Sequence, residues 1–587
     1  MPSKTIFVAV DFGTTFTGVA YSDPSDNRSD SEPLLFRQWN EEQDKVPTVL
    51  RYEDSSRSGL GTRSRGLRWG VQVKPGQSCH KWFKLNLEPT YLLSGISSTV
   101  DLSQAYPDDE RDPALPDVSA KRLTTDFLTA VREHVERYLR QEYMTESGAE
   151  PRLKWMLTVP AVWTNEATNA TRECARLAGM ASRTQDLLLT SEPEAAFICA
   201  SKSIPERYLM VGKRILVLDA GGGTVDIVTY KVREVQPHLK VEENLVPNGG
   251  KCGSVFINRV FEKMIDRKLN SVNPHLVLSA PARLEMMKSF ETFIKCKYNG
   301  DDTEENISVN GLPDTLSLRI KGGFMEISRE EMNTVMDVVV NQVLLLVKDQ
   351  VQGVREQGDD VAAIVLVGGF GGSPYLRKRL GDDEYLGTIY QVRCSNPATA
   401  VVRGAVIKGL QDLSPHRRTV LSRKSVCSLG VTSSVPFRPG HHPESHKYED
   451  SVHNEHLCKD VLSYFVRKNQ DLSEDNPVEF SLERLVPIEG PFVFADVVYE
   501  TYENEPPEIL NDTCRALGSL DSDLSDVPGY LYERPGNGDF FKIRYKIKAT
   551  FSSAGDVKVE LDFNGTKHGS VRLRYGNSAL FRPVRRD

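Results

Sequence analysis

IFVAVDFGTTFT, residues Ile6–Thr17, returns later in the chain as a near-copy, ILVLDAGGGTVD, residues Ile215–Asp226. In both segments an apolar run ends in an aspartate, and glycines, a threonine and further β-branched residues follow. This order is typical of a strand, a tight turn and a second strand, with Asp11 and Asp219 at the end of the first strand. The sequence therefore predicts two related hairpins, and their repetition argues against two ordinary glycine-rich turns.

The two predicted turns have the chemistry of a phosphate clamp. Glycine lets backbone N–H groups approach a bulky anion, because no Cβ stands in the way. Thr14, Thr15 and Thr224 add hydroxyl donors, and the two aspartates offer the oxygen ligands that magnesium prefers. Two such hairpins facing each other would hold a nucleotide polyphosphate. A dinucleotide-binding loop fits less well, because neither turn contains G-x-G-x-x-G, and both lack the Walker A pattern.

Composition narrows the class of protein. The chain has 587 residues, of which 39% are hydrophobic and 26% charged, as expected of a soluble protein with more than one domain. Its net charge of −8 argues against a general nucleic-acid binder. It has no apolar stretch long enough to span a membrane and no signal-peptide pattern. Nine scattered cysteines without C-x-x-C predict reduced thiols, so we expect a cytoplasmic protein, with the nucleus as the alternative.

Periodicity predicts the elements around the hairpins. Residues 121–143 carry one apolar face and predict a helix. A later short strand ends just before Glu192, which places this carboxylate where open α/β sheets bind ligands. Ser328 and Glu331 form a capping-box signature that opens a long helix. Residues 362–372, AAIVLVGGFGG, predict a further strand that runs into glycines.

The composition changes near residue 411. Residues 411–425 carry several basic side chains and predict a linker. Further on, apolar side chains from Phe541 to Phe551 alternate with lysines and an arginine, which is typical of an antiparallel strand with one face in water. Residues 426–587 are therefore expected to form a β-rich, sandwich-like domain.

Five segments together resemble the 70-kDa heat-shock protein (DnaK-like) family, in the family's order and spacing. They are VDFGTTFTGVAYS (10–22), LTVPAVW (157–163), SEPEAA (191–196), VLDAGGGTVDI (217–227) and IVLVGGFGGSPYL (364–376). The phosphate motifs also occur in the wider actin and sugar-kinase superfamily, whereas TVPAVW and SEPEAA are typical of the heat-shock branch. Because the glycine motif reads GGF and the C-terminal half is divergent, the chain is more closely similar to the atypical branch that is common in fungi and includes the vertebrate twelve-type members.

The resemblance implies an α/β fold with two parts. A two-lobed, actin-like ATPase domain, built from duplicated ribonuclease-H-like units, would span residues 1–410. Its lobe I would cover about 1–200, its lobe II about 201–410, and a small inserted subdomain about 232–326. A linker at 411–425 would lead to a mainly β C-terminal domain at 426–587 that binds a substrate or partner.

The resemblance also implies roles for individual residues. Magnesium would be held, largely through water, by Asp11, Asp219, Glu192 and Asp226. Phosphates would contact both hairpins, at Gly13, Thr14, Thr15, Gly221, Gly222, Gly223 and Thr224. The remaining nucleotide contacts would come from Gly249, Gly250, Glu291, Lys295, Gly368, Gly369 and Gly372. The catalytic residues would be Lys84, Glu192, Asp219 and Thr224.

Several assignments stay open or depart from the family. Lys84 of HKWFKL is implied to place the attacking water, with Lys81 as the alternative register and a plain surface lysine as a further alternative. Phe16 stands where the family usually has tyrosine. Gly372 stands where the family has an arginine that stacks on adenine. Ala398 stands where the family has a carboxylate.

These features predict an ATP-binding, heat-shock-like protein with slow magnesium-dependent ATP hydrolysis and a chaperone-like or regulatory role. One alternative is a nucleotide-dependent scaffold or sensor with little turnover. A small-molecule kinase of the same superfamily is less favoured, because a second β domain has no role in it. The C-terminal domain is expected to bind a polypeptide client or a regulatory protein, and neither nucleic acid nor membrane.

A histidine cluster offers a separate hypothesis. His441, His442, His446, His453 and His456 lie close in sequence to Cys458. Imidazole and thiolate groups suit zinc, but the polar, proline-bearing context favours a solvated loop.

Overall fold

The structure, a computed structural model, has two compact units: residues 1–91 with 100–420, and residues 92–99 with 421–587. Each unit has its own buried apolar core. The structure describes residues 5–575 except 23–31, 40–42, 54–65, 89–100, 108–116, 145–147, 182–186, 302–303, 451–454, 530–531, 535–538, 552–556, 564 and 566–569.

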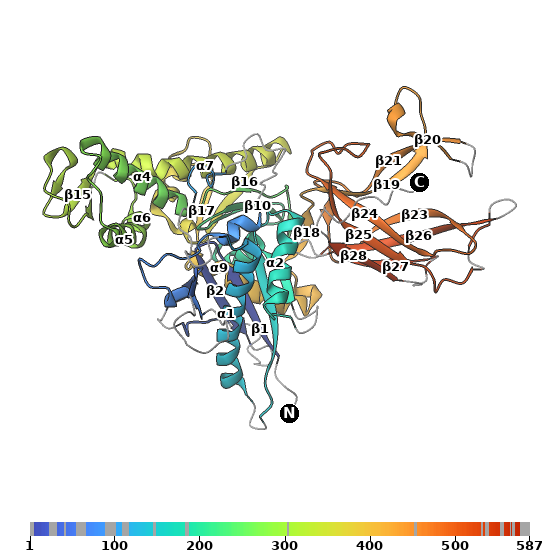
Figure 1. Ribbon diagram of the computed structural model, residues 1–587, viewed down its shortest axis with the longest axis horizontal. Helices are drawn as coiled ribbons and strands as arrows, with labels where there is room; N and C mark the ends of the chain where they lie inside the picture. Colours follow the sequence, from blue (N-terminus) through green and yellow to red (C-terminus); the bar gives the residue numbers. More distant parts are fainter. Residues whose placement is uncertain are drawn as a thin grey trace. The chain divides into compact units, whose positions relative to one another are not determined.

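The first sheet of unit 1 carries the first hairpin. Strand β1 pairs antiparallel with β2 and parallel with β7, and β7 pairs parallel with β8. Strands β3 and β4 both pair with β2. The bounds are β1 (Thr5–Phe12), β2 (Phe16–Ser22), β3 (Leu34–Leu35), β4 (Lys45–Pro47), β7 (Arg152–Val159) and β8 (Leu187–Ser191), with a separate ribbon of β5 (Leu50–Glu53) and β6 (Gly66–Trp69). Helices α1 (Ala120–Tyr143) and α2 (Asn165–Leu177) pack against each other (Figure 1).

The second sheet of unit 1 repeats this topology. Strand β9 pairs antiparallel with β10 and parallel with β16, and β16 pairs parallel with β17. Strands β11 and β12 both pair with β10. The bounds are β9 (Arg214–Ala220), β10 (Val225–Glu234), β11 (Lys240–Glu243), β12 (Asn248–Gly250), β16 (Val361–Val367) and β17 (Tyr390–Arg393). An antiparallel hairpin beside two parallel strands thus occurs twice, which confirms the predicted α/β fold with two related halves.

Two helices join the halves at small residues. Helix α3 (Glu192–Ala200) follows the first sheet and α9 (Ala400–Asp412) follows the second, and the two helices pack together. A Cβ on Gly404 of α9 would lie 1.6 Å from the backbone oxygen of Ala195 in α3, so only glycine permits this approach. Helix α8 (Pro374–Asp382) lies between β16 and β17 in the chain.

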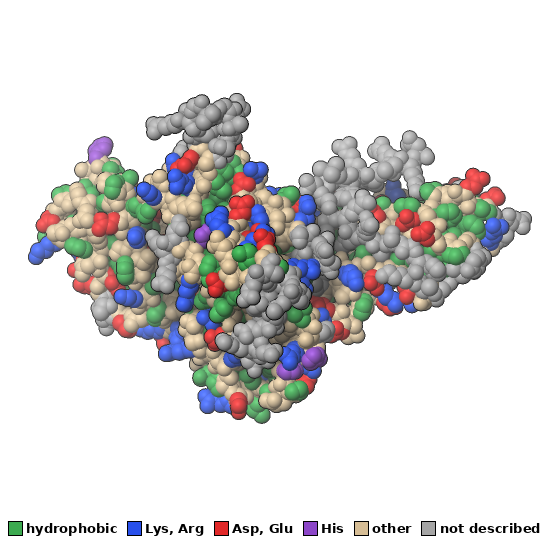
Figure 2. Space-filling view, turned by 90° about the horizontal axis from the view of Figure 1, so that it is seen from below, with side chains coloured by type: hydrophobic (Ala, Val, Ile, Leu, Met, Phe, Trp, Pro, Cys, Tyr) green, Lys and Arg blue, Asp and Glu red, His purple; other side chains and the backbone are tan. Residues whose placement is uncertain are grey.

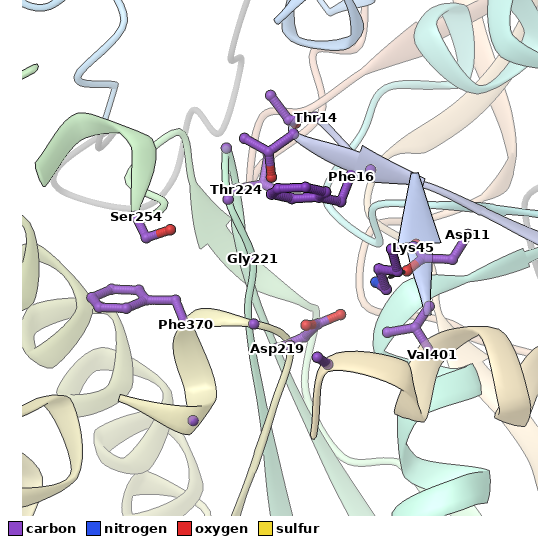
Figure 3. A pocket seen from close by; sticks show the side chains of 18 of the residues that line it. Asp11, Thr14, Phe16, Lys45, Asp219, Gly221, Thr224, Ser254, Phe370 and Val401 are labelled. Carbon is purple, nitrogen blue, oxygen red and sulfur yellow. Dashed lines mark hydrogen bonds and ion pairs between the residues drawn. The ribbon is translucent and has the colours of Figure 1, made fainter. Parts of the chain in front are cut away.

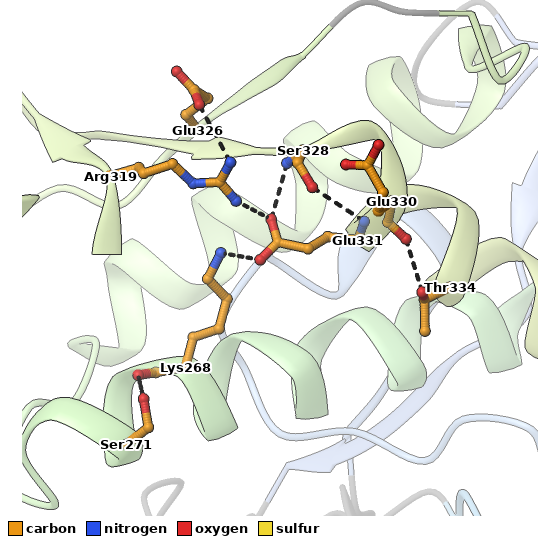
Figure 4. Close-up of polar contacts among 8 residues, drawn as sticks. All are labelled: Lys268, Ser271, Arg319, Glu326, Ser328, Glu330, Glu331 and Thr334. Atoms are coloured by element: carbon orange, nitrogen blue, oxygen red, sulfur yellow. Dashed lines mark hydrogen bonds and ion pairs between the residues drawn. The ribbon is translucent and has the colours of Figure 1, made fainter. Parts of the chain in front are cut away.

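The inserted part of unit 1 contains α4 (Val255–Val272), α5 (Ala280–Ser289), α6 (Lys295–Lys297) and a small sheet of β13 (Glu305–Ser308), β14 (Ile320–Lys321) and β15 (Phe324–Ile327). The long helix α7 (Arg329–Glu356) begins at the predicted capping box, which is confirmed. Ser328 accepts from the Glu331 amide at 3.3 Å, and its own amide donates to Glu331 Oε2 at 2.9 Å (Figure 4). Lys268 of α4 also donates to Glu331, at 2.6 Å, so the cap ties two helices together.

Unit 2 is built from antiparallel sheets. The larger has the order β20-β21-β19-β24-β25-β28 and the smaller the order β23-β26-β27. The bounds are β19 (Ser428–Pro436), β20 (Lys447–Asp450), β21 (Glu455–Val466), β23 (Val478–Pro487), β24 (Val493–Thr501), β25 (Arg515–Asp523), β26 (Phe540–Phe551), β27 (Val557–Asp562) and β28 (Ser570–Tyr575). After β27 the chain changes sheet, because β28 pairs with β25.

The predicted alternation along β26 is confirmed. Its apolar side chains, such as Ile543 and Ile547, are buried in the core of unit 2. Its basic side chains face the neighbouring strand β23, where Arg544 pairs with Glu483 at 2.6 Å and Lys548 with Glu479 at 3.3 Å. Carboxylates opposite the basic stripe therefore neutralise it.

The predicted linker has regular structure at both ends. Helix α9 continues to Asp412, and residues 420–424 form β18 (Val420–Lys424). Within unit 2, Arg423 and Lys424 of β18 pair with Leu472 and Asp471 of β22 (Asp471–Leu472).

The surface is mixed in charge. On the face shown in Figure 2, lysine and arginine side chains lie among aspartate and glutamate side chains, without a field of one sign. No helix in the described part of the chain is both long and apolar enough to cross a membrane.

Candidate functional site

A cavity of about 600 Å³ opens in unit 1 where the two hairpins meet (Figure 3). Most residues predicted to bind nucleotide line it, although they come from distant parts of the chain. The predicted residues on the cavity are Asp11, Gly13, Thr14, Thr15, Lys84, Glu192, Asp219, Gly221, Gly222, Gly223, Thr224, Glu291, Lys295, Gly368, Gly369 and Gly372. The fold therefore gathers both hairpins, the Glu192 turn and the GGF segment around one space.

The two turns touch at positions that only glycine can occupy. A Cβ on Gly222 would lie 2.3 Å from the hydroxyl oxygen of Thr15. A Cβ on Gly223 would lie 2.4 Å from the hydroxyl oxygen of Thr14. A side chain at either glycine would push the hairpins apart, so the glycines keep the threonine hydroxyls at the cavity.

The first hairpin is braced by β4. The register pairs Asp11 of β1 with Gly18 of β2, and Gly18 with Lys45 of β4. The Lys45 side chain crosses over Gly18, where a Cβ would meet its Cε at 3.2 Å. Its Nζ reaches Asp11 Oδ2 at 2.6 Å, and Thr158 donates to Asp11 Oδ1 at 3.3 Å. Beyond β4, the Thr48 hydroxyl donates to the Gly13 carbonyl at 2.9 Å, which holds the turn in place.

The second hairpin has a different partner at the equivalent position. Asp219 of β9 is paired across the hairpin with Asp226 of β10, so two carboxylates face each other. Behind Asp219 lies Gly368, at φ +80°, where a Cβ would come within 2.5 Å of Asp219 Oδ1. Asp226 Oδ1 accepts from the Val162 amide at 3.3 Å, which ties this carboxylate to the first half.

Three carboxylates of the site, Asp219, Asp226 and Glu192, have raised pKa values. Burial, and then the charges of Glu192 and Asp226, raise the pKa of Asp219 well above its usual value. Burial and the charge of Glu192 raise the pKa of Asp226 to about 7. Burial also raises the pKa of Glu192, although Lys84 opposes this shift. A divalent cation would relieve these repulsions, so this acidic cluster fits magnesium.

Lys84 reaches the cavity from a short 3₁₀ helix, residues Phe83–Leu87. Trp82, the residue before this helix, has a left-handed backbone conformation at φ 57°. The chain therefore turns just before the helix begins. Lys84 Nζ donates to Glu192 Oε1 at 2.6 Å and lies 5.4 Å from the centre of the Trp163 ring. Lys81, the alternative register, is not on the cavity.

A π-turn, residues Phe290–Ile294, forms part of the cavity wall. It interrupts the helical run from α5 to α6, and such insertions are frequent at functional sites. Glu291 and Lys295 both line the cavity, as do Thr292 and Cys296. Lys295 is buried and donates to Asn258 at 2.8 Å, and burial lowers its pKa. The π-turn has no simple periodicity signal, so Thr292 and Cys296 were not predicted.

Three predicted residues do not line the cavity. Asp226 is paired across the hairpin with Asp219 but is not among the residues that line the cavity. Gly249 and Gly250 belong to β12, which pairs with β10. A Cβ on Gly249 would lie 2.3 Å from the Val225 backbone oxygen, so close strand packing explains this glycine. The departures Phe16, Gly372 and Ala398 do line the cavity.

Other cavity residues were missed in the sequence. They are Asp44, Lys45, Ser254, Phe370, Ser373, Thr399 and Val401, with Thr292 and Cys296 of the π-turn. Lys45 follows a polar stretch, and its place on the site depends on the pairing of β4 with β2. Ser254 lies directly before helix α4, and no motif in the sequence marks it as a site residue.

The histidine cluster of unit 2 fits zinc poorly. His441, His442 and Glu508 have ligand atoms within 4.8 Å of one another. The Arg438 amide donates to Nδ1 of His442 at 3.0 Å, which leaves the ring proton of a neutral imidazole on Nε2. That nitrogen is the one 3.9 Å from Glu508, and it cannot bind a metal while protonated. His453 lies outside the described residues.

Residues 109–432 match the Hsp70 protein family. Heat shock 70 kDa protein 12A of Mus musculus is 22% identical over 95% of this chain and 91% of its own length. Heat shock 70 kDa protein 12B of Homo sapiens is 24% identical over 80% of this chain and 77% of its own length. Chaperone protein DnaK of Burkholderia cepacia is 26% identical over 48% of this chain and 41% of its own length. These similarities agree with the resemblance that the five motifs indicate.

Proposed function

Because the chain belongs to the Hsp70 family, we propose that unit 1 binds ATP together with magnesium and hydrolyses it slowly to ADP and phosphate. The observation that carries this proposal is the contact of the two hairpins. Thr14 and Thr15 of the first hairpin meet Gly222 and Gly223 of the second at one cavity. Backbone amides and hydroxyls from both halves thus surround a single space, as a polyphosphate requires.

In the proposed hydrolysis, each group of site residues has a separate role. Magnesium, when bound near Asp11, Asp219, Glu192 and Asp226, would neutralise phosphate charge and orient it. The hydroxyls of Thr14, Thr15 and Thr224 would donate to phosphate oxygens. Lys84, held by Glu192, would stabilise the negative charge that develops on the transferred group and position the attacking water. Phosphoryl transfer needs positioning and charge stabilisation more than covalent catalysis. These residues can supply both positioning and charge stabilisation.

We further propose a chaperone-like or regulatory role for the full chain. Relatives over most of this chain carry the name heat shock 70 kDa protein, and DnaK carries the name chaperone. Unit 2 would supply the surface for a polypeptide client or a regulatory protein. The protein would then act in the cytoplasm or nucleus, without nucleic acid or membrane as its ligand.

A phosphate-release assay on the full chain, paired with ATP and ADP binding by calorimetry, tests this function. Slow phosphate release into water, with magnesium required, is the expected result. Binding without release would favour a nucleotide-dependent scaffold or sensor. Phosphorylation of an added small acceptor would favour a kinase. Absence of ATP and ADP binding would overturn the proposal.

A further inference from the structure

We propose that Lys45 is a nucleotide-contacting residue: its ammonium group neutralises Asp11 and donates to the polyphosphate, so that nucleotide binding depends less on magnesium. This inference rests on the proposed function that the cavity binds ATP and ADP. It adds a specific contact and a specific metal dependence to that function.

The register of three strands builds this contact. Lys45, Gly18 and Asp11 occupy paired positions on β4, β2 and β1. Because Gly18 has no Cβ, the lysine stem lies across the middle strand and its Nζ reaches Asp11 Oδ2 at 2.6 Å. A larger residue at position 18 would occupy the path of the stem. Figure 3 shows Lys45 and Asp11 next to each other in the pocket.

Lys45 keeps donors for a ligand, whereas the other two cavity lysines are enclosed. An ammonium group has three donors, and among the described residues Asp11 is the one hydrogen-bond partner of Lys45. The Lys45 side chain is 20% exposed and lines the cavity. The Lys84 side chain is only 2% exposed and packs near the rings of Phe12 and Trp163. Lys295 is buried against Asn258.

Besides pairing with Asp11, Lys45 acts on two further carboxylates of the cluster. It opposes the upward pKa shifts of both Glu192 and Asp219. A polyphosphate that enters a cluster of four carboxylates meets strong repulsion unless cations are present. Lys84 and Lys45 are the cations that the described chain pairs with this cluster, at Glu192 and Asp11. Lys45 therefore supplies, from within the protein, part of the positive charge that magnesium would otherwise have to bring.

The experiment measures ADP affinity by calorimetry on the full chain, in magnesium and in EDTA. Lys45→Met removes the charge and keeps a long apolar stem, and Lys45→Arg restores the charge. Lys74→Met, an exposed lysine away from the cavity, is the matched control. Thermal melting without nucleotide establishes that each variant is folded, and Lys45→Gln replaces Lys45→Met if the latter melts below the assay temperature.

We expect wild type and Lys74→Met to retain ADP binding in EDTA. Lys45→Met should bind ADP about 10- to 100-fold more weakly than wild type in EDTA, the range for a lost hydrogen bond from a charged group. In magnesium its loss should be smaller, and Lys45→Arg should recover most of the affinity. Equal affinities of Lys45→Met and wild type in EDTA, or equal losses in EDTA and magnesium, would overturn the inference while the proposed function stands. A wild type that binds no nucleotide in either buffer would overturn both.

Discussion

The two hairpins of unit 1 share their local sequence and topology but differ in charge. In the first, the residue paired with Asp11 is Gly18, and Lys45 from the third strand crosses it to reach the carboxylate. In the second, the residue paired with Asp219 is Asp226, a second carboxylate. Among the described residues, Asp219 has no cation within ion-pair distance. In the first half of the duplicated fold the aspartate is neutralised by a lysine, whereas in the second half two paired aspartates have no such ion pair among the described residues.

This difference assigns distinct tasks to the two halves. An uncompensated carboxylate pair attracts a hard cation, whereas a carboxylate already bound by an ammonium group does so less. Under the proposed function, the second hairpin would be the half that depends on magnesium, whereas Lys45 would bring positive charge to the first. Sequence similarity between the hairpins hides this asymmetry, because Lys45 lies outside both repeats.

The largest difference between the two hairpins is expected when Asp219 and Asp11 are replaced one at a time. Asp219→Asn should lower ATP hydrolysis by on the order of 10²-fold, the cost of losing one preorganised electrostatic group, and should lower ADP affinity far less. Asp11→Asn should cost roughly tenfold or less, because Lys45 remains to contact phosphate. Single-turnover phosphate release and ADP calorimetry measure the two quantities. Equal loss of rate and ADP affinity in Asp219→Asn would point to a purely structural aspartate, and equal rates in both variants would remove the asymmetry.

The second lysine that pairs with the acidic cluster, Lys84, can be tested in the same way. Lys84→Ala should lower turnover by about 10- to 100-fold while ATP affinity stays nearly unchanged, because its interaction is made mainly in the transition state. Lys81→Ala is the matched control, since Lys81 belongs to the same segment but does not line the cavity. Steady-state turnover and ATP affinity are measured for both. A loss in Lys81→Ala without one in Lys84→Ala would show that the catalytic register is the other lysine.

Features formed by residues close together in the sequence could be predicted, whereas contacts between distant segments could not. The aspartates, glycines and threonines of the hairpins are contiguous, so their joint role could be predicted before the structure. The capping box at Ser328 and the alternation along β26 are local for the same reason. Lys45 escaped prediction because its contact depends on strand pairing across 34 residues. Gly249, which the resemblance assigns to the nucleotide, does not line the cavity, and close strand packing accounts for its glycine.

The pH dependence of stability tests the raised pKa of Asp226 in the second hairpin. The pKa of Asp226 is about 7 in the folded protein, whereas an unfolded aspartate titrates near 4. Between these values the folded state holds more protons than the unfolded state, so the free energy of unfolding falls as pH rises. Without magnesium or nucleotide, we expect a loss of about 2 kcal/mol between roughly pH 5.5 and pH 7.5.

Asp226→Asn is the variant for this test, because its amide oxygen can still accept from the Val162 amide. Its free energy of unfolding, measured by urea denaturation at each pH, should change less than that of wild type. Magnesium should also flatten the wild-type profile, since it favours the charged carboxylates. A wild-type stability that rises over this pH range, or identical profiles for the two proteins, would contradict the raised pKa that burial and the charge of Glu192 give to Asp226.

The smallest effect we expect is that of unit 2 on nucleotide binding. The predicted linker, residues 411–425, carries arginines and a lysine. Lys424 pairs with Asp471 at 3.0 Å, and Arg423 lies 3.9 Å from Glu474, both within unit 2. Docking of this strand elsewhere would have to break its pairing with β22, and burial of its charges without partners costs several kcal/mol.

Residues 1–420 should therefore bind ATP with an affinity within roughly fivefold of the full chain, about 1 kcal/mol. By reciprocity, a peptide that binds unit 2 should change ATP affinity by no more than this factor. The full chain with Lys424→Ala is the control, because it loses the ion pair with Asp471 while both units remain. Calorimetry with ATP in magnesium gives the affinities. A difference of tenfold or more caused by unit 2 would mean that a charged, strand-forming linker still transmits the nucleotide state.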